Sequence, residues 1–451
     1  MLSRLRRDQH LFDSNRFRSR FRRDGMTFLF FSFTICHSPF SFAQSPTLSY
    51  AHHIIDTLTS RTMDGRGYVD SSDFKAATFI QHEFQKLLLQ SFTPDYFQPF
   101  HFDVNVFPGK MKVKIDKTKL IPGKDYLADA ASGGVRGKFK VLQLPHASND
   151  TSAAAIETIT QFLCDHAAEK IFIAYNKDKF TKPQASAVQT LIRKYNGFNV
   201  KGYIEQSQSK LTWDASQEDL TFCYLQVKDS SDAKFHRIKI NIEHQLKQNY
   251  LSRNVIGYIK GTEHPDSFIV FTAHYDHLGQ MGDGTYFPGA NDNASGTSMV
   301  LNLSNYFSQH PPKYSIAFIS FSGEELGLLG SSYFVEHPLF PLEKIKFLVN
   351  LDIVGTGEEG IKVVNATEFP KQFDKLVKLN EAHQYLKQVS PRGKAANSDH
   401  YPFYMKGVAS FFIYTMGGIS AYHDIYDRAE TLPLTMYDDL FKLLVDFENS
   451  F

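Results

Sequence analysis

The pattern of apolar and polar residues divides the chain into regions of different texture. From about Ser45 to Pro99 apolar residues recur at spacings of three and four, as in DFKAATFIQHEFQKLLLQSF, which predicts helices. From about Asp103 to Glu243 short runs such as KMKVKI and KIFIAYN predict strands, and TSAAAIETITQFLCDHAAE between them predicts a helix. The second of these regions is therefore expected to form an α/β module of its own.

Regular alternation of strand and helix begins at NVIGYIKG, residues 254–261. Four further runs are short, apolar and β-rich: SFIVFTAHYD, YSIAFISFSG, IKFLVNLDIVG and VASFFIYT. The segments between them, such as DNASGTSMVLNLSNYF and EELGLLGSSYFVEH, predict helices. Buried strands that alternate with helices indicate a largely parallel sheet with helices on both faces. In such a sheet the ligand site lies beyond the carboxyl ends of the strands.

Side chains that can bind metal ions follow three of these strands. FIVFTA, AFISFSG and FLVNL each run directly into histidine or carboxylate residues, and two later segments, PGANDNASG and GGISAYHDIYD, carry more. One polar strand end means little, because strand ends meet water. Several in one sheet indicate a site. The candidate residues are His274, Asp292, Glu324, Glu325, Asp352, Tyr422 and His423.

Two histidines and several carboxylates form the donor set of a zinc centre. Zinc binds imidazole nitrogen and carboxylate oxygen, and catalytic sites leave one position open for water. Two such ions about 3.5–4 Å apart can share a carboxylate and activate a water between them. The sequence supplies two histidines and three carboxylates as ligands, and one further carboxylate that can accept the proton of the water. Without cations these carboxylates would repel one another.

Six segments resemble, in their order, the zinc-dependent aminopeptidases, a family of secreted two-zinc exopeptidases that also contains the glutaminyl cyclases. They are AHYDHLG, PGANDNASG, FSGEELGLLGS, NLDIVG, SDHYPF and YH, within about residues 250–430. The resemblance implies an α/β fold of the phosphorylase/hydrolase-like zinc exopeptidase type, with a mixed, mostly parallel sheet flanked by helices on both faces. Residues 44–102 and 246–451 would form the peptidase domain. Residues 103–245 would form an inserted, smaller α/β domain similar to the protease-associated domain.

The resemblance also implies a role for each ligand. His274 and Asp352 would bind one zinc ion, and Glu325 and His423 would bind the other. Asp292 would bridge the two ions. Zinc is the expected metal, and other divalent metals remain alternatives.

Three further residues take roles by the same resemblance. Glu324 would be the general base that takes a proton from the bridging water and passes it to the leaving amine. Tyr422 would help to stabilise the tetrahedral oxyanion. Asp276 would hydrogen-bond His274 from outside the metal coordination and fix its tautomer.

Several neighbouring residues keep alternative interpretations. Asp276 could ligate a metal directly, and His277 is expected to be a neighbour of the site. Asp399 and His400 are expected near the site, around the ligands or in the substrate cleft, without binding zinc. The acidic residues after His423 are expected to form a solvated loop, with a calcium site as the alternative. These acidic residues are Asp424, Asp427 and Glu430.

The first 43 residues match a secretory signal peptide. They carry eight arginines and three aspartates, followed by an apolar run over residues 28–36 and by Ser41-Phe42-Ala43. The apolar run is too short for stable membrane insertion, which needs about 20 residues. A buried N-terminal helix is the alternative, and Met26 could be the true start, with residues 1–25 an over-extended reading frame. The leader predicts export to the periplasm or the extracellular space.

Charge and cysteine content restrict the remaining function classes. The formal net charge of +1 implies neither nucleic acid nor a membrane surface as a partner. After removal of the leader only Cys164 and Cys223 remain, which either pair or stay as buried thiols. The sequence does not fix the oligomeric state.

The leading hypothesis is a metallo-aminopeptidase that hydrolyses peptides with a free N-terminus. A glutaminyl cyclase on the same fold, a related carboxypeptidase and a non-catalytic receptor-like relative are the alternatives.

Overall fold

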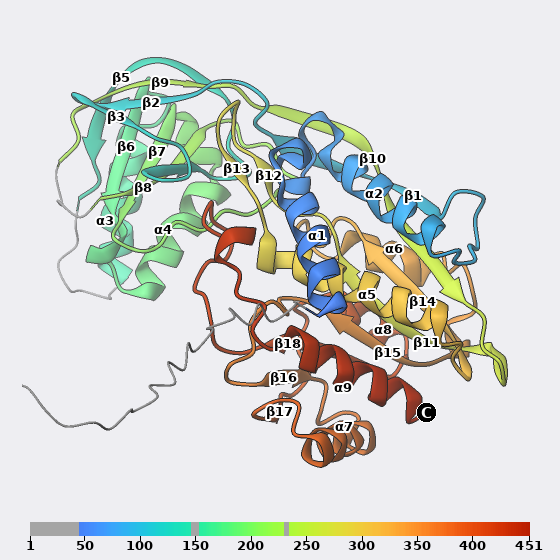
Figure 1. Ribbon diagram of the computed structural model, residues 1–451. Coiled ribbons are helices and arrows are strands. Elements are labelled where there is room, and N and C mark those ends of the chain that lie inside the picture. The colour runs from blue at the N-terminus through green and yellow to red at the C-terminus, as the bar shows by residue number, and fades with distance from the viewer. Residues whose placement is uncertain (1–44, 146–152, 230–233) are drawn as a thin grey trace, which may run out of the picture. The chain divides into compact units, whose positions relative to one another are not determined.

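Two eight-stranded sheets organise the part of the chain that the structure describes (Figure 1). The structure is a computed structural model, and it describes residues 45–145, 153–229 and 234–451. The predicted leader, residues 1–43, lies outside the described residues. No helix among the described residues is both long enough and apolar enough to cross a membrane.

The first sheet is mixed and mostly parallel at its centre. Its order is β1-β10-β14-β11-β15-β18-β16-β17, in which β14, β11, β15 and β18 are parallel neighbours, while β1 and β10 form an antiparallel edge. The strands are β1 (Phe97–Val106), β10 (Gln245–Ile259), β11 (His264–His274), β14 (Tyr314–Phe321), β15 (Ile345–Leu351), β16 (Ile361–Val364), β17 (Val389–Pro391) and β18 (Ser410–Thr415). The mostly parallel sheet is as expected, and antiparallel pairings occur toward both of its edges.

Helices cover both faces of this sheet, as the fold class predicts. One face packs apolar side chains of alternate strand residues, such as Phe271 and Phe318, against a large core that includes residues of five helices. On the other face Val270 and Ile319 meet Phe334 and Phe403 from two short helices. The five helices are α1 (Pro46–Thr59), α2 (Ser72–Lys86), α5 (Gly296–Gln309), α7 (Pro370–His383) and α9 (Tyr437–Asn449), and the two short ones are α6 (Leu329–Glu336) and α8 (His400–Met405).

The second sheet is built entirely from residues between 111 and 242. Its order is β3-β2-β9-β5-β6-β7-β8-β4. The strands are β2 (Met111–Ile115), β3 (Thr118–Leu120), β4 (Tyr126–Ala128), β5 (Val135–Gln143), β6 (Ile171–Asn176), β7 (Gly202–Ser207), β8 (Cys223–Lys228) and β9 (Arg237–Ile242). Helices α3 (Ala153–Asp165) and α4 (Lys182–Lys194) pack on one face of β6 and β7 through residues such as Leu163 and Ile192.

One predicted helix begins later than expected. The segment EELGLLGSSYFVEH was predicted to be helical from Glu324, but α6 begins at Leu329. Glu324 and Glu325 instead lie in a tight turn, in which the Glu324 carbonyl accepts hydrogen bonds from the N–H groups of Gly327 (2.8 Å) and Leu328 (3.0 Å). Gly327 has a φ of +101°, which explains why a helix cannot run through this segment.

The two cysteines of the described residues do not pair. Cys164 is exposed and Cys223 is buried in the second sheet, and both thiols are free. Of the two alternatives left by the sequence, pairing is therefore wrong, and only one of the thiols is buried.

Candidate metal centre

The predicted ligands meet at one edge of the first sheet. His274 is the last residue of β11, and it pairs with Phe321 at the end of the parallel strand β14. Asp352 directly follows β15, which is also parallel to β11. Because parallel strands bring their carboxyl ends to one edge, side chains from three separate segments converge there. Asp292 from the π-helical turn η5 (Ala290–Ser295) and His423 from the loop before α9 join them.

The distances divide the cluster into two halves that share one carboxylate. His274 Nε2 lies 3.4 Å from Asp352 Oδ1 and 3.3 Å from Asp292 Oδ1. His423 Nε2 lies 3.2 Å from Glu325 Oε2 and 3.1 Å from Asp292 Oδ2. Each oxygen of Asp292 thus faces a different histidine.

The hydrogen bonds that hold Asp352 involve only one of its carboxylate oxygens, so the other is available to a cation. Its Oδ2 accepts a hydrogen bond from Ser398 (2.8 Å), which in turn accepts one from Asn350 (2.8 Å), and Thr272 donates to Asn350 (2.7 Å). Its Oδ1 is buried and has no hydrogen-bond partner among the described residues, although it faces His274. A buried carboxylate oxygen normally has a partner. An ion held between Asp352 and His274 would supply it, so this half of the cluster fits a metal.

Glu324 and Glu325 leave their turn toward different partners. Glu325 Oε1 accepts a hydrogen bond from His277 Nδ1 (2.6 Å), while its Oε2 faces His423. A carboxylate oxygen of Glu324 lies within 4.8 Å of the ligand atoms of His274 and Asp352. The adjacent residues Glu324 and Glu325 therefore place one carboxylate in each half of the cluster.

Asp276 connects the strand end to this turn. Its carboxylate accepts hydrogen bonds from the Tyr68 hydroxyl (2.7 Å) and from the Glu324 N–H (3.3 Å). His274 Nδ1 hydrogen-bonds the main-chain oxygen of Asp276 (3.1 Å), whereas the carboxylate lies 3.7 Å away. The predicted hydrogen bond between Asp276 and His274 is therefore present, and the main-chain oxygen of Asp276 makes it, not the carboxylate.

The loop that carries Asp292 is held by two buried charges. Asp427 accepts hydrogen bonds from the N–H groups of Asn291 (2.8 Å) and Asp292 (3.0 Å). Arg66 donates to the carbonyls of Pro288 (2.6 Å) and Gly289 (2.8 Å). Gly289 has a φ of +60°, and a Cβ there would lie 2.4 Å from the His277 ring. These contacts fix the direction of Asp292.

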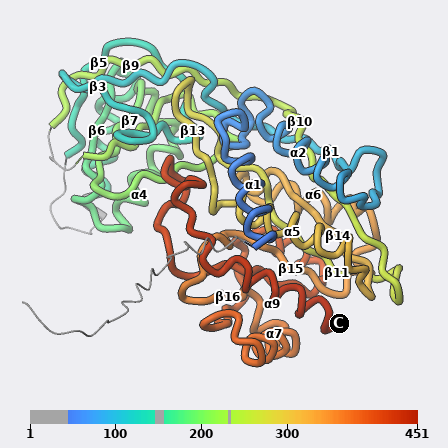
Figure 2. Tube along the Cα trace, viewed as in Figure 1, coloured from blue at the N-terminus to red at the C-terminus, as the bar shows by residue number. Residues whose placement is uncertain are grey.

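His423 is held by a segment of the second module. Its Nδ1 hydrogen-bonds the Trp213 carbonyl (2.9 Å) and lies 3.2 Å from Asp214 Oδ1. Lys210 donates to the Tyr422 carbonyl (2.9 Å) and forms an ion pair with Asp424 (2.7 Å). In Figure 2 the red loop before α9 rises toward the green strands of the second sheet. An α/β module of distant sequence thus orients this predicted ligand.

Tyr422 lies at the exposed side of the cluster. Its ring stacks on His423 with a centroid distance of 4.0 Å, and the residue is 45% exposed. Asp399 is fully buried, and neither of its carboxylate oxygens has a hydrogen-bond partner among the described residues. Burial raises the pKa of Asp399 to about 7. His400 is also fully buried, and burial lowers its pKa to about 4.

The expectation of a solvated loop after His423 is wrong for two residues. Asp427 is fully buried, and Asp424 is 5% exposed and paired with Lys210. Only Glu430 of the three acidic residues is exposed. Both buried carboxylates have protein partners, which compensate for the loss of contact with water.

The electrostatics of the cluster show a shortage of positive charge. Burial would lower the pKa of His274, but the nearby carboxylates Asp352 and Glu324 raise it well above its usual value. Burial opposes ionisation of Asp292, yet hydrogen bonds from His274 and His423 hold its pKa well below the usual range. Burial and the surrounding carboxylates raise the pKa of Glu324. Divalent cations would supply the charge that the histidines otherwise provide as imidazolium.

Comparison with known proteins identifies the region that carries this cluster. Residues 254–447 match the sequence profile described as peptidase family M28. These residues form a peptidase family M28 domain. All predicted metal-centre residues lie inside the M28 domain, whereas Lys210 and Asp214 lie outside it.

Two relatives illustrate the extent of the sequence match. Aminopeptidase YwaD of Bacillus subtilis (strain 168) is 32% identical over 188 residues, which are 41% of this chain and 40% of that protein. A probable zinc metalloprotease of Pyrenophora tritici-repentis is 38% identical over 116 residues, 24% of this chain and 23% of that protein. The matched part thus spans less than half the length of these curated relatives.

Solved structures share the fold beyond the M28 domain. A zinc aminopeptidase from Bacillus subtilis has a TM-score of 0.64 at 19% identity, over 88% of this chain and 93% of that chain. A peptidase M28 precursor from Shewanella amazonensis SB2B also has a TM-score of 0.64, at 16% identity, over 89% and 92% of the two chains. At these identities the likeness concerns the fold, which includes the second sheet.

Sequence reasoning missed the side chains that support the ligands. Arg66 and Asp214 precede the M28 domain and belong to no motif. His277 and Asp427 stood in noted segments, but nothing in their spacing indicated which contacts they make. Of these residues, only His277 could have been placed near the metal centre from the sequence, because it lies three residues after His274.

Proposed function

We propose that this protein is a di-metal aminopeptidase that removes N-terminal residues from peptides. The observation that carries the proposal is the position of Asp292, whose two oxygens lie 3.3 Å from His274 Nε2 and 3.1 Å from His423 Nε2. A carboxylate placed between two histidines, each with a second carboxylate beside it, is the donor arrangement of a two-cation site.

The proposed ligands divide as the contacts do. His274 and Asp352 would hold one cation, Glu325 and His423 the other, and Asp292 both. Zinc suits this set of imidazole and carboxylate donors, and other divalent metals remain alternatives. Bound cations would polarise the scissile carbonyl and make water a better nucleophile.

Glu324 is the proposed general base. It lies next to the ligand set, and the neighbouring carboxylates and burial raise its pKa. A carboxylate in such surroundings has enough basicity to take a proton from the attacking water and to return it to the leaving amine. The half-exposed Tyr422 beside His423 would donate a hydrogen bond to the developing oxyanion. Asp399 would act on the ligands through its charge, without contact to a cation.

The free α-amine of the substrate matches the excess of negative charge in this site. A cationic amine close to Glu324, Asp352 and Asp399 gains the electrostatic attraction that these buried carboxylates offer. This favours trimming from the N-terminus over trimming from the C-terminus, where the substrate would bring a carboxylate.

Residues 103–245 are proposed to be an inserted domain similar to the protease-associated domain. Its segment at Trp213 and Asp214 lies directly beside His423. Such a domain would restrict the size of substrates that reach the metal centre, while residues 44–102 and 246–451 carry the peptidase domain.

Export is proposed on the basis of residues 1–43, whose arginine-rich and apolar segments resemble a signal peptide. The structurally similar M28 peptidase from Shewanella amazonensis SB2B is described as a precursor. Sequencing the N-terminus of the protein recovered from the periplasm or the medium tests this, with a start near Gln44 as the expected result. Recovery only from the cytoplasm with residues 1–43 intact would contradict it.

Hydrolysis of aminoacyl-nitroanilides by the purified protein tests the proposed activity. We expect release of nitroaniline, loss of this activity after chelation, and its return on addition of zinc. N-terminally acetylated substrates should remain intact, because they lack the free amine. Chelator-insensitive cleavage would contradict a metal mechanism. Cyclisation of a peptide with N-terminal glutamine, without release of a residue, would assign the site to a glutaminyl cyclase instead.

A further inference from the structure

Among the described residues, no helix covers one face of one half of the second sheet. Along β2 and β9, Val113, Ile115, Ile238 and Ile240 point into a core on the opposite face. Strand residues alternate between faces, so the lysines and arginines between them point the other way, into solvent. Helices α3 and α4 lie on the side of the sheet to which these lysines and arginines point, but they cover the neighbouring strands β6 and β7. We call the exposed half, on β3, β2, β9 and β5, the basic face.

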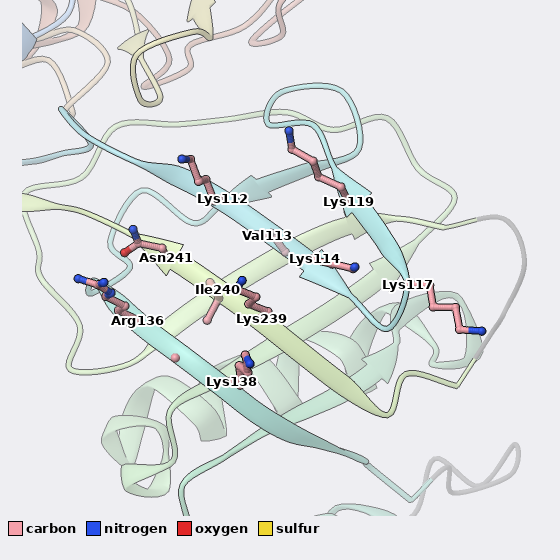
Figure 3. A pocket seen from close by; sticks show the side chains of 11 residues that line it. Lys112, Val113, Lys114, Lys117, Lys119, Arg136, Lys138, Lys239, Ile240 and Asn241 are labelled. Atoms are coloured by element: carbon pink, nitrogen blue, oxygen red, sulfur yellow. The ribbon is translucent and has the colours of Figure 1, made fainter.

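Strand register places like charges directly opposite one another on the basic face. Lys119 lies opposite Lys114, Lys114 opposite Lys239, and Lys239 opposite Lys138, so that four lysines form a row across four strands. A second row contains Lys112, Asn241 and Arg136. Figure 3 shows these side chains spread over the sheet, where they line a shallow hollow of about 570 Å³.

This arrangement costs stability within the chain. Like charges directly opposite on neighbouring strands destabilise a sheet. Within the described ranges, none of the lysines of the four-lysine row lies within ion-pair distance of a carboxylate. Two acidic residues just beyond the ends of these strands pair with other residues, Glu243 with Lys110 and Asp116 with His236. The charge pattern therefore has no partner within this part of the protein.

We propose that the basic face docks the protein on an anionic lipid surface. The cations form a two-dimensional array on a sheet, which matches a planar field of lipid phosphates better than the single line of charge on an extended polymer. Lysine predominates over arginine, and its ammonium is a point charge suited to diffuse attraction. The face carries no aromatic side chain on which nucleic-acid bases could stack.

The inference is independent of the metal centre and of any peptidase activity. It differs from the expectation drawn from net charge. The formal charge of +1 averages over the whole chain and hides this concentration, which becomes visible only when the strand register is known.

Vesicle co-sedimentation of the full chain tests the proposal. The parent protein should bind vesicles containing phosphatidylglycerol and should not bind vesicles of pure phosphatidylcholine. The variant K114Q/K138Q/K239Q should bind the anionic vesicles about a hundredfold more weakly, because each lysine near such a surface contributes roughly a fivefold factor. High salt should release the parent protein, since screening weakens this attraction.

A matched control removes three positive charges elsewhere. K371Q/K378Q/K387Q changes three exposed lysines in or just after α7, and it should bind like the parent. The arginine-rich residues 1–43 are present in every variant, and repetition with a chain that begins at Gln44, the start of the compact unit, removes their contribution. The test variant should melt at the parent's temperature or slightly higher, because it relieves like-charge repulsion.

Two results would overturn the proposal. One is equal binding of the parent and K114Q/K138Q/K239Q to anionic vesicles in both chain lengths. The other is binding of an oligonucleotide or a polyglutamate peptide by the parent without binding to anionic vesicles, which would assign the face to a linear polyanion.

Discussion

Arg66 is a fully buried cation whose partners are main-chain carbonyls. It donates to Tyr275 (2.7 Å), Leu58 (3.0 Å), Pro288 (2.6 Å) and Gly289 (2.8 Å), and so joins the end of β11 to the loop that carries Asp292. Burial lowers its pKa to about 10, which leaves it charged at neutral pH. A single planar guanidinium can reach all four carbonyls.

Arg66→Lys should therefore lower the free energy of unfolding by at least about 3 kcal/mol, because one ammonium cannot replace these bonds and leaves buried carbonyls unpaired. Denaturant unfolding measures the change. Arg61→Lys, at a side chain that is 48% exposed, is the control and should cost less than about 1 kcal/mol. A stability of Arg66→Lys equal to the parent's would contradict the assigned contacts.

Glu448 provides a pH dependence away from the metal centre. It is 3% exposed in α9, and burial raises its pKa from 4.5 to about 7, against the opposing charge of Lys313. Between these two pH values the folded protein keeps a proton that the unfolded chain releases. Because the unfolded chain then binds fewer protons, this group makes stability fall as pH rises from 4.5 to 7, and its contribution is constant above that range.

Glu448→Gln should remove this dependence and stabilise the protein at pH 8 by about 2–3 kcal/mol. Unfolding free energies measured from pH 5 to pH 8 show it as a shallower slope than the parent's. Glu381→Gln, at an exposed position of α7, should keep the parent's slope. An unchanged slope for Glu448→Gln would mean that its carboxyl titrates in the folded protein as it does in the unfolded chain.

At the scale of elements, a short segment of the second module clamps the loop around His423. Lys210 donates to the carbonyls of Ser420 (2.7 Å) and Tyr422 (2.9 Å) and pairs with Asp424 (2.7 Å). Side chains outside the ligand set that orient a metal ligand commonly contribute 10- to 100-fold to metal affinity. The clamp is therefore expected to act on the cation that His423 and Glu325 would hold.

Lys210→Met should weaken the binding of one cation about tenfold and leave the other unchanged. Zinc titration against a competing chelator measures both affinities. Lys201→Met, an exposed position of the same module just before β7, is the matched control and should bind both cations like the parent. If Lys210→Met weakened the binding of both cations equally, the substitution would act on the whole fold and not on the loop around His423.

The elements differ in how well the sequence predicted them. The buried parallel strands were found because their apolar runs are nearly continuous, as in β11 and β15. The antiparallel edge strand β1 was not found, since FQPFHFDVNV contains Pro99 and lies across the boundary between the two predicted regions. The helix predicted from Glu324 begins at Leu329, because local spacing does not reveal a turn that the site requires.

The candidate ligands were predictable for the same reason as the strands. Parallel strands deliver their terminal residues to one edge, so the position of His274 or Asp352 in sequence indicates its position in space. Asp214 and Arg66 follow no such rule. Their contacts depend on how distant segments pack, and a single sequence carries no pattern for that.

At the scale of the whole molecule, metal should stabilise the fold. Four carboxylates share a cluster with two histidines, and bound cations would relieve the repulsion among the carboxylates. Chelation should lower the melting temperature, and zinc at one hundred times its Kd should restore about 2.7 kcal/mol of stability. Differential scanning calorimetry with and without zinc tests this, and equal melting temperatures would contradict a native cation site.

Turnover of an aminoacyl-nitroanilide by Glu324→Gln, with the metal content determined on the same sample, tests whether Glu324 is the general base of a two-metal centre. Glutamine keeps the size of Glu324 and cannot accept the proton of the attacking water. We expect kcat to fall about 10²–10⁴-fold while close to two metal ions are retained per chain. Turnover at the parent's rate in the fully loaded variant would contradict the role of Glu324 as general base.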